Sequence, residues 1–508
     1  MRRRVSTAPL LTLSLDRTLG AEPLHRQIYQ QVRSGVLEGR LPAGARLPST
    51  RTLANELQCS RNTVVGAFDQ LFAEGYIEGQ VGSGSYVSRV LPEDLLPVAP
   101  AVPAPPPEPE NLPRIGRRGA ALAALSPPGA AARRGVGPAF VPGLPELSLF
   151  PFDLWGRLLA QQWRNPTVGL LRHGMPAGHP ALRSAIADYL RGVRALCVEP
   201  EQIFVTSGAQ QALDLIVRVL LDPDEPVWIE DPGYSGLRGP LLAAGARIVP
   251  VPVDQEGLCV EAGRRLCPGA RMALVTPARQ YPLGISLSLS RRLELIDWAK
   301  AAGAWLVEDD YDSEYRYAGR PLAPLMSLQA AAGRVVYVGS FSKVMFPSLR
   351  LGYLVVPPAL VEVVSRARAA LEDHPPVMVQ PVLARFIAEG HFAAHVRRMR
   401  AVYAGRQAAL FEALHDKLEG AVEVDRQEAG LHLLARLPAG SDDRRLSTEL
   451  LDVGLVAPAL SDYYANPPQV GAEAACPALL LGFAAVPEGQ MRDGVERLAR
   501  VLERSAVH

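Results

Sequence analysis

The chain has 508 residues, which is more than one ordinary domain holds, so two or three domains are expected. Its apolar fraction of 48% and charged fraction of 21% are typical of a globular protein with a large core. The net charge of +1 excludes a strongly basic or acidic protein, although the first 91 residues hold eleven arginines and no lysine against seven acids.

The five cysteines are scattered, and their spacing matches neither a zinc site nor a disulfide framework. An odd, dispersed set of this kind is typical of a reducing compartment. No apolar stretch is long enough to span a membrane. We therefore expect a cytoplasmic protein that has no metal site and no membrane partner.

The first 90 residues follow the pattern of a small helical domain that ends in a hairpin. Apolar residues recur at helical spacing over residues 24–38. Ser49 or Thr50 then caps a short second helix, and Ser60 caps a third one after a turn. Residues 76–87 have two short strand-like runs around a glycine-rich turn, which predicts a β-hairpin. This order of elements indicates a winged helix-turn-helix.

The third helix starts with Arg61, Asn62 and Thr63, whose side chains can contact phosphates or base edges. The alternative is an ordinary helical module with a solvated polar N-terminus, but the complete pattern favours DNA binding. Residues 41–87, with the phrase Gly-x-x-Leu-Pro-Ser-x-Arg-x-Leu-Ala, resemble the DNA-binding domain of GntR-type bacterial regulators.

That resemblance implies that Arg51, Arg61 and Thr63 contact the operator and that Ser83 and Gly84 form the tip of the wing. Gly66 stands where the family often has a basic residue, so fewer phosphate contacts are expected here.

A proline-rich run from Pro92 to Pro113 divides the chain, because so many prolines prevent a helix interior or a central strand. It should be an extended, semi-rigid spacer. We place a DNA-binding domain at 1–90, a Pro/Ala-rich linker at 91–137 and an effector domain at 138–508.

The large domain alternates strand-like and helical runs, which predicts an α/β domain with a mainly parallel sheet. Ligands of such sheets lie at the carboxyl ends of the strands. The run from Gly339 to Gly352 follows one of these strands and holds Lys343 among small hydroxyl residues. A lysine in a tight loop can form a Schiff base with an aldehyde cofactor. Read alone, it is equally well a solvated surface lysine.

The remaining groups that a pyridoxal phosphate site requires also follow strand-like runs. Asp309 can pair with the protonated pyridine nitrogen, although a turn residue in an acidic loop is the alternative. Tyr311 can bond the phenolic oxygen, and Tyr234 offers an aromatic face, although singly it is more often loop or core filler. The phosphate requires N–H groups at a helix start together with hydroxyls and an arginine. The residues that we expect to bind the cofactor are Asp309, Tyr311, Tyr234, Ser207, Gly208, Ala209, Gln210, Tyr281, Ser340, Ser342 and Arg350.

Together these motifs and their order resemble the fold-type I, aspartate-aminotransferase-like enzymes over about residues 140–508. With the GntR-type domain, the whole chain resembles the MocR subfamily of regulators, whose phrases are matched at 140–151, 308–317 and 479–484. The resemblance implies a winged helix-turn-helix joined to a fold-type I domain, with pyridoxal 5'-phosphate as cofactor. It also implies a homodimer with a shared interface.

The sequence departs from the family pattern at two positions that affect the chemistry of the site. Arg279 replaces a histidine that such proteins often have near the ring. Leu480 stands where aminotransferases usually have the arginine that grips the substrate carboxylate. The sequence therefore favours a PLP-dependent transcriptional regulator that binds operator DNA and senses pyridoxal phosphate or an amine or amino acid. The alternative is a catalytically active aminotransferase with an appended DNA-binding module, because Lys343 and Asp309 are both present.

Overall fold

A computed structural model describes residues 13–18, 21–80, 84–91, 115–125, 139–319, 322–331, 333–466 and 476–505. The chain divides into two compact units, Met1–Arg114 and Ile115–His508, which we call the N-terminal and C-terminal units. Each is taken separately below. None of the described helices has the length and apolar character needed to cross a membrane.

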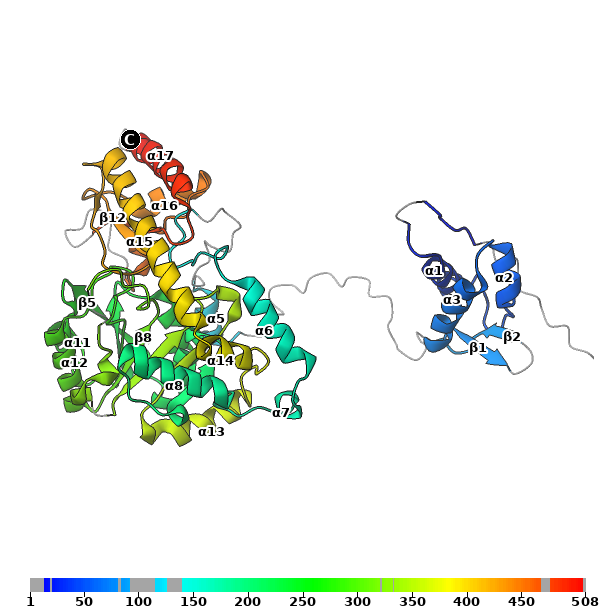
Figure 1. Ribbon diagram of the computed structural model, residues 1–508, viewed down its shortest axis with the longest axis horizontal. Coiled ribbons are helices and arrows are strands. Elements are labelled where there is room, and N and C mark those ends of the chain that lie inside the picture. Colours follow the sequence, from blue (N-terminus) through cyan, green and yellow to red (C-terminus); the bar gives the residue numbers. More distant parts are fainter. Residues whose placement is uncertain are drawn as a thin grey trace, which may run out of the picture. The chain divides into compact units, whose positions relative to one another are not determined.

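The described residues of the N-terminal unit form three helices and a hairpin, coloured blue in Figure 1. They are α1 (Leu24–Leu37), α2 (Thr50–Glu56), α3 (Arg61–Ala73), β1 (Ile77–Gln80) and β2 (Gly84–Val87). The strands β1 and β2 pair antiparallel, with Ile77 opposite Val87. This arrangement is the winged helix-turn-helix that the sequence predicts.

Two serines fix where α2 and α3 begin. The side chain of Ser49 accepts a hydrogen bond from the N–H of Thr52, and that of Ser60 accepts one from the N–H of Thr63, both over 3.1 Å. The inner faces of the three helices and the hairpin enclose one small core. Its fully buried members include Ile28, Val32, Leu53, Val64, Ala67 and Leu71.

The C-terminal unit is built on an eight-stranded sheet in the order β3-β10-β9-β8-β7-β4-β5-β6. The strands are β3 (Ile203–Thr206), β4 (Pro226–Asp231), β5 (Arg247–Asp254), β6 (Gly257–Leu258), β7 (Met272–Val275), β8 (Trp305–Asp310), β9 (Val335–Ser340) and β10 (Gly352–Val355). Neighbours from β5 through β9 run parallel, whereas β10 is antiparallel to both β3 and β9. The sheet is therefore mainly parallel, as expected.

Helices cover both faces of this sheet, because its strands are apolar on both sides. Val227 and Ile229 of β4 pack into the core under α9 (Ala209–Leu220), α10 (Arg238–Ala244) and α13 (Val361–Glu372). Trp228 points to the other face, where it stacks on Trp298 of α12 (Leu289–Ala302) with ring centroids 3.7 Å apart. Helices α11 (Val260–Leu266) and α12 pack side by side there (Figure 1).

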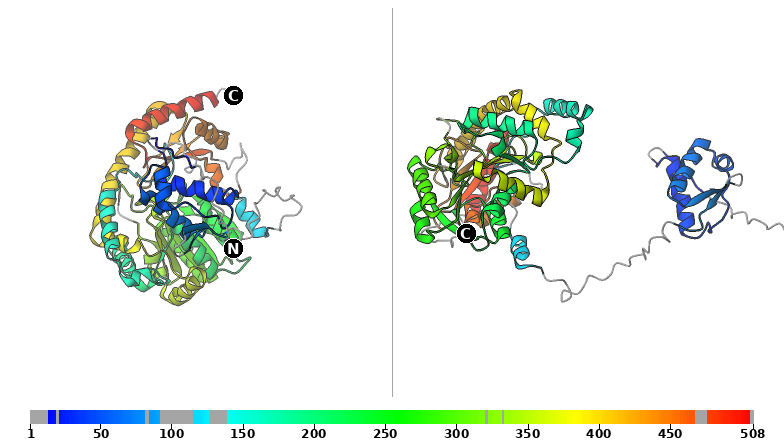
Figure 2. Two further views of the ribbon diagram at one scale, coloured as in Figure 1. Left: turned by 90° about the vertical axis from the view of Figure 1, so that its right-hand side faces the viewer. Right: turned by 90° about the horizontal axis from the view of Figure 1, so that it is seen from below.

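The rest of the unit surrounds this sheet. A second, three-stranded antiparallel sheet contains β11 (Glu423–Val424), β12 (His432–Arg436) and β13 (Ala478–Gly482). Figures 1 and 2 show α15 (His391–Leu418) and α17 (Glu488–Ser505) packed along each other at the periphery of the unit. The remaining helices are α5 (Arg117–Ala123), α6 (Phe152–Arg164), α7 (Val168–Leu171), α8 (Pro180–Arg194), α14 (Gln380–Ala388) and α16 (Asp443–Asp452). Helix α5 lies within the segment predicted to be a linker without regular structure.

Candidate functional site

A pocket of about 980 Å³ lies in the C-terminal unit where several strands of the large sheet end. The predicted cofactor residues that line it are Lys343, Asp309, Tyr311, Tyr234, Gly208, Ala209, Gln210, Tyr281, Ser340, Ser342 and Arg350. Residues that lie up to 142 positions apart in the chain thus meet in one cavity. Ser207 is the one predicted cofactor residue that does not line it.

Lys343 occupies the loop between β9 and β10, and its half-buried side chain lines the pocket. Its Nζ donates a hydrogen bond to the backbone carbonyl of Gly143 over 2.9 Å. Gly143 has φ +67°, and a Cβ there would lie 2.8 Å from Nζ, so a glycine is required for this approach. Burial lowers the pKa of Lys343, although the carboxylates of Asp312 and Asp309 act in the opposite direction. The amine is therefore neutral more often than that of an exposed lysine.

Two adjacent aspartates of β8 have different surroundings. Asp309 lines the pocket, and its Oδ1 has no hydrogen-bond partner among the described residues. Asp310 faces the other side of the strand, where it accepts hydrogen bonds from Arg194 and from the hydroxyl of Tyr337. Burial raises the pKa of Asp309 to about 7, and the nearby carboxylates, Asp310 first, add to this shift. A cationic group in the pocket would give Oδ1 of Asp309 a hydrogen-bond partner and would lower the pKa of Asp309 again.

The opposite end of the pocket is an anion cradle. Gly208 is the N-cap of α9 with φ +94°, and the next residues expose the N–H groups of the first helical turn. A Cβ built on Gly208 would lie 3.6 Å from Nη1 of Arg350, so the guanidinium faces this turn. Gly352 also approaches it, because a Cβ there would lie 2.9 Å from the Cα of Gly208. The helix start and the arginine suit a phosphate.

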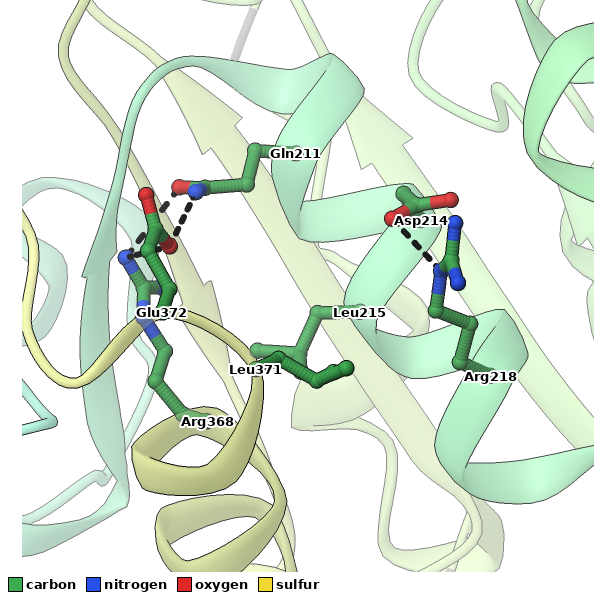
Figure 3. A pocket seen from close by; sticks show the side chains of 7 residues that line it. All are labelled: Gln211, Asp214, Leu215, Arg218, Arg368, Leu371 and Glu372. Carbon is green, nitrogen blue, oxygen red and sulfur yellow. Dashed lines mark hydrogen bonds and ion pairs between the residues drawn. The ribbon is translucent and has the colours of Figure 1, made fainter.

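The N–H of Ser207 already donates a hydrogen bond to a residue outside this cradle. It donates to Oε1 of Gln211 over 2.6 Å, and the same oxygen accepts from Nη2 of Arg368 over 3.2 Å. Figure 3 shows Gln211 beside Glu372 and Arg368, at one end of a cavity of about 300 Å³ between α9 and α13. The cradle is thus supported by a polar network around the buried Arg368, which sequence reasoning missed.

Tyrosine rings form the wall above the predicted cofactor position. Tyr281 packs edge-to-face against Tyr234, Tyr311 and Tyr463, with ring centroids between 5.4 and 6.0 Å apart. Its hydroxyl lies 3.2 Å from that of Tyr463. Burial raises the pKa of Tyr463 to about 12, so these hydroxyls stay protonated at neutral pH.

Arg279 is buried behind this wall and does not line the pocket. Its Nη1 donates to the hydroxyl of Tyr311 over 3.2 Å, and its Nη2 donates to the backbone carbonyl of His432 over 3.0 Å. A Cβ on Gly430 would lie 2.2 Å from its Cζ, so the guanidinium fits closely in place. Burial lowers the pKa of His432 well below its ordinary value, and the charge of Arg279 adds to this, so the imidazole is neutral.

Leu480 is fully buried in β13, within a small apolar cluster beside Tyr281 and Tyr463. It does not line the pocket and offers no charge to a ligand.

The predicted DNA-contacting residues lie on the surface of the N-terminal unit. Arg51, Arg61 and Asn62 are exposed at the starts of α2 and α3. The hydroxyl of Thr63 is 2.8 Å from that of Ser60, so it already has a local partner. Gly84 begins β2 with φ +110°. Ser83 lies outside the described residues.

Sequence reasoning missed residues whose neighbours are set only by the fold. Arg46 is one, because its guanidinium lies against Gly84, where a Cβ would be 3.5 Å from its Nε. Gly143 and His432 come to the pocket from distant segments, and no spacing signals them. Asp312 lines the pocket and directly follows Tyr311 in the same acidic run, so its place beside a predicted cofactor residue was a usable signal.

Comparisons with known proteins separate the same two parts. Residues 24–87 match the bacterial regulatory proteins of the gntR family, and residues 159–498 match the aminotransferase class I and II family. The chain is 39% identical to the probable rhizopine catabolism regulatory protein MocR of Rhizobium meliloti, covering 96% of this chain and 95% of that protein. It is 33% identical to the pyridoxine biosynthesis transcriptional regulator PdxR of Corynebacterium glutamicum, covering 92% and 93%.

Among solved structures, the chain is similar to LysN, an alpha-aminoadipate aminotransferase from Thermus thermophilus crystallised with N-(5'-phosphopyridoxyl)-L-leucine. The TM-score is 0.69 at 27% identity, covering 77% of this chain and 98% of that one. The chain thus belongs to the MocR-type family of transcriptional regulators, in which a GntR-family helix-turn-helix domain precedes a fold-type I aminotransferase-like domain.

Proposed function

We propose that this chain is a PLP-dependent transcriptional regulator that binds operator DNA through its winged helix-turn-helix and senses pyridoxal phosphate, or an amine or amino acid that reacts with it, in the pocket of Lys343. The observation that carries the proposal is the unpartnered, buried Oδ1 of Asp309 in the same pocket as Lys343. A buried carboxylate oxygen without a partner is costly unless a ligand supplies one.

The residues present fit the cofactor at each of its groups. Asp309 would pair with the protonated ring nitrogen, and Lys343 would bond its aldehyde carbon. The start of α9 and Arg350 would hold the phosphate, and Tyr234 would cover the ring. When bound, the cofactor supplies an aldehyde that forms reversible covalent bonds with amines. Burial would favour the neutral amine of Lys343. Asp309 at the ring nitrogen and Arg350 at the phosphate would hold the cofactor from two sides.

The site supports sensing better than turnover. Leu480 is an apolar residue within a packed cluster, so it cannot grip a substrate carboxylate. Arg279 donates to Tyr311, pairs with the buried Asp312 over 3.4 Å and does not line the pocket. A regulator needs to bind a ligand and change shape, whereas an aminotransferase must also hold two different substrates in reacting geometry.

The part of the pocket next to the linker would couple ligand binding to DNA binding. Ala124 and Leu125, which directly follow α5, line the pocket, and Nη1 of Arg118 donates to the carbonyl of Ala243 in α10 over 3.2 Å. A seven-residue helix is not stable alone and depends on such contacts. A ligand that touches Leu125 would bias whether α5 stays docked on α10, and α5 belongs to the segment that joins the DNA-binding domain to the effector domain.

A homodimer is part of the proposal. Large apolar side chains that are exposed in the single chain gather within residues 147–175, namely Leu147, Leu149, Phe152, Trp163, Val168, Leu171 and Met175. Such a concentration is typical of a surface that a partner covers. A twofold protein also suits a repeated operator.

The lysine assignment has an unusually clean test, because the sequence contains only three lysines, Lys300, Lys343 and Lys417. The protein is loaded with pyridoxal phosphate, reduced with borohydride, digested and mapped by mass spectrometry. The cofactor mass is expected on the peptide of Lys343 and absent from the variant Lys343→Ala. The matched control Lys300→Ala removes a lysine of α12 that pairs with Asp297 over 3.9 Å, and it should load normally. Labelling of Lys300 or Lys417 instead would overturn the site.

The regulatory part is tested with a DNA fragment from upstream of the gene itself. A sequence-specific shift at moderate salt is expected, and its affinity should differ between the loaded protein and Lys343→Ala. Equal binding to unrelated DNA at that salt would refute the regulator, and steady turnover of an amino donor with keto acids would favour the enzyme.

A further inference from the structure

We propose that Arg238 is the group that recognises the carboxylate of the ligand, so that the pocket selects amino acids over simple amines. This inference rests on the proposed function, in which an amine binds beside Lys343.

Arg238 is placed and held at the rim of the pocket. It is the first residue of α10, four positions after Tyr234, and it lines the same cavity as Lys343. Its Nη2 donates to the backbone carbonyls of Tyr463, over 3.2 Å, and of Tyr464. These bonds fix the guanidinium while Nη1 and Nε remain as donors. In the part of the chain that the structure describes, Arg238 forms no ion pair.

The positive charge of Arg238 is thus only partly compensated. The carboxylate of Asp231 lies close enough for Arg238 to lower its pKa, against burial, which raises it. Asp231 itself accepts a hydrogen bond from the N–H of Ala465 over 2.6 Å. A half-buried arginine with a weak counter-charge is a ready partner for a ligand anion.

The other arginines near the site are committed elsewhere. Lys343, Arg350 and Arg238 are the cationic side chains in the described lining of the pocket. Arg350 faces the turn at Gly208, which suits the phosphate of the cofactor. Arg279 is buried behind Tyr311 and does not reach the cavity. Arg238 therefore remains for a carboxylate.

The surrounding wall strengthens the selection. Part of the pocket lining is apolar, and its members Leu455, Ala457 and Pro458 offer no hydrogen bond from their side chains. A carboxylate placed among such groups without a cation would lose its hydration and gain nothing. With Arg238 present, it gains a charge-assisted hydrogen bond. The ligand class is therefore an amine that also carries a carboxylate.

The experiment titrates the full-length, cofactor-loaded protein with matched probe pairs and follows the absorbance spectrum of the cofactor. The pairs are L-leucine with isoamylamine and L-phenylalanine with phenethylamine, which differ only in the carboxylate. Wild type should prefer the amino acid of each pair. Arg238→Gln should weaken amino-acid binding about 10- to 100-fold, the effect of losing a charged hydrogen bond, and leave the amines unchanged. Arg238→Lys should keep part of the preference, because it keeps the charge.

Arg444→Gln is the matched control. Arg444 holds the same loop as Arg238, donating to Asp462 over 2.8 Å and to the carbonyl of Ser461 over 3.0 Å, but it does not line the pocket. It should keep the amino-acid preference. An equal loss in Arg444→Gln, or an equal loss of amines and amino acids in Arg238→Gln, would mean that Arg238 only supports the loop.

The two proposals fail differently. If the probes bind wild type without any preference for the amino acids, the role of Arg238 is refuted while amine sensing stands. If no probe changes the spectrum although the cofactor is attached to Lys343, amine sensing by this pocket and the role of Arg238 are both refuted, and pyridoxal phosphate itself remains the sensed ligand.

Discussion

Asp309 and Asp310 are neighbours on β8, yet Asp309 lines the pocket without a hydrogen bond from the described residues, whereas Oδ2 of Asp310 accepts hydrogen bonds from the buried Arg194 and from Tyr337. The alternation of a strand separates them onto opposite faces. The same residue type therefore serves a ligand on one side and the fold on the other, and substitutions at the two positions should have opposite signatures.

Asp310→Asn should destabilise the cofactor-free protein by about 3–5 kcal/mol, because it leaves the buried charge of Arg194 without its partner. Asp309→Asn should not lower that stability. Its raised pKa means that the carboxylate costs folding free energy increasingly as the pH rises from 4 toward 7, and the amide removes this cost. Asp309→Asn should instead weaken cofactor binding about 10- to 100-fold. Chemical unfolding and cofactor titration measure the two effects, and a reversed pattern would exchange the two roles.

Cofactor attachment should depend on pH in a way set by the burial of Lys343. Only the neutral amine attacks an aldehyde, and burial lowers the pKa of this lysine below its ordinary value of 10.5. The rate at which the cofactor attaches should therefore rise with pH and level off at a lower pH than the same reaction with the side-chain amine of Nα-acetyl-lysine. Stopped-flow absorbance measures it. A coincident midpoint for protein and free lysine would mean that the pocket does not shift the amine.

Gly143→Ala should slow loading and weaken cofactor binding, because the new Cβ would lie 2.8 Å from Nζ of Lys343 at a backbone φ of +67°. Gly156→Ala is the matched control, since Gly156 lies within α6 and its Cβ would meet nothing within 4 Å. That change should stabilise the protein by about 0.5–1 kcal/mol and leave loading unchanged. Equal loading by both variants would contradict a close approach of Lys343 to Gly143.

The helices, the strands and the site residues that follow strand ends could be predicted from the sequence. Local hydrophobic periodicity and the position of a residue after a strand are both visible in a single chain. It predicted the winged helix-turn-helix, the mainly parallel sheet and the lysine loop. It did not predict Gly143, His432 or Arg238 as pocket residues, because each arrives from a segment whose position depends on tertiary packing. It also placed Ser207 in the cradle, where the fold gives its N–H to Gln211 instead.

Arg61→Ala should reduce the affinity for DNA roughly uniformly across sequences. It should also reduce the slope of log affinity against log salt concentration by about the amount of one phosphate contact. Arg61 is exposed at the start of α3, where its charge can reach the backbone of DNA. Arg40→Ala is the control in the same unit, since Arg40 is exposed and pairs with Glu38 over 2.7 Å. Fluorescence anisotropy at several salt concentrations measures both. An unchanged salt slope for Arg61→Ala would place the DNA contact elsewhere.

Ligand binding should change how firmly α5 is held. Trypsin can cut after Arg117 and Arg118, and docking of α5 on α10 opposes this because a protease needs extended chain. None of the residues of α5 is buried, so the docking is weak, and a modest gain at Leu125 suffices to shift it. A pocket-filling amino acid should therefore slow cleavage there several-fold, relative to a site such as the exposed Arg426 between β11 and β12. Leu125→Ala should remove the ligand effect and keep the basal rate. If ligand protects Arg117 and Arg426 alike, the effect is global stabilisation, and α5 does not carry the signal from the pocket to the linker.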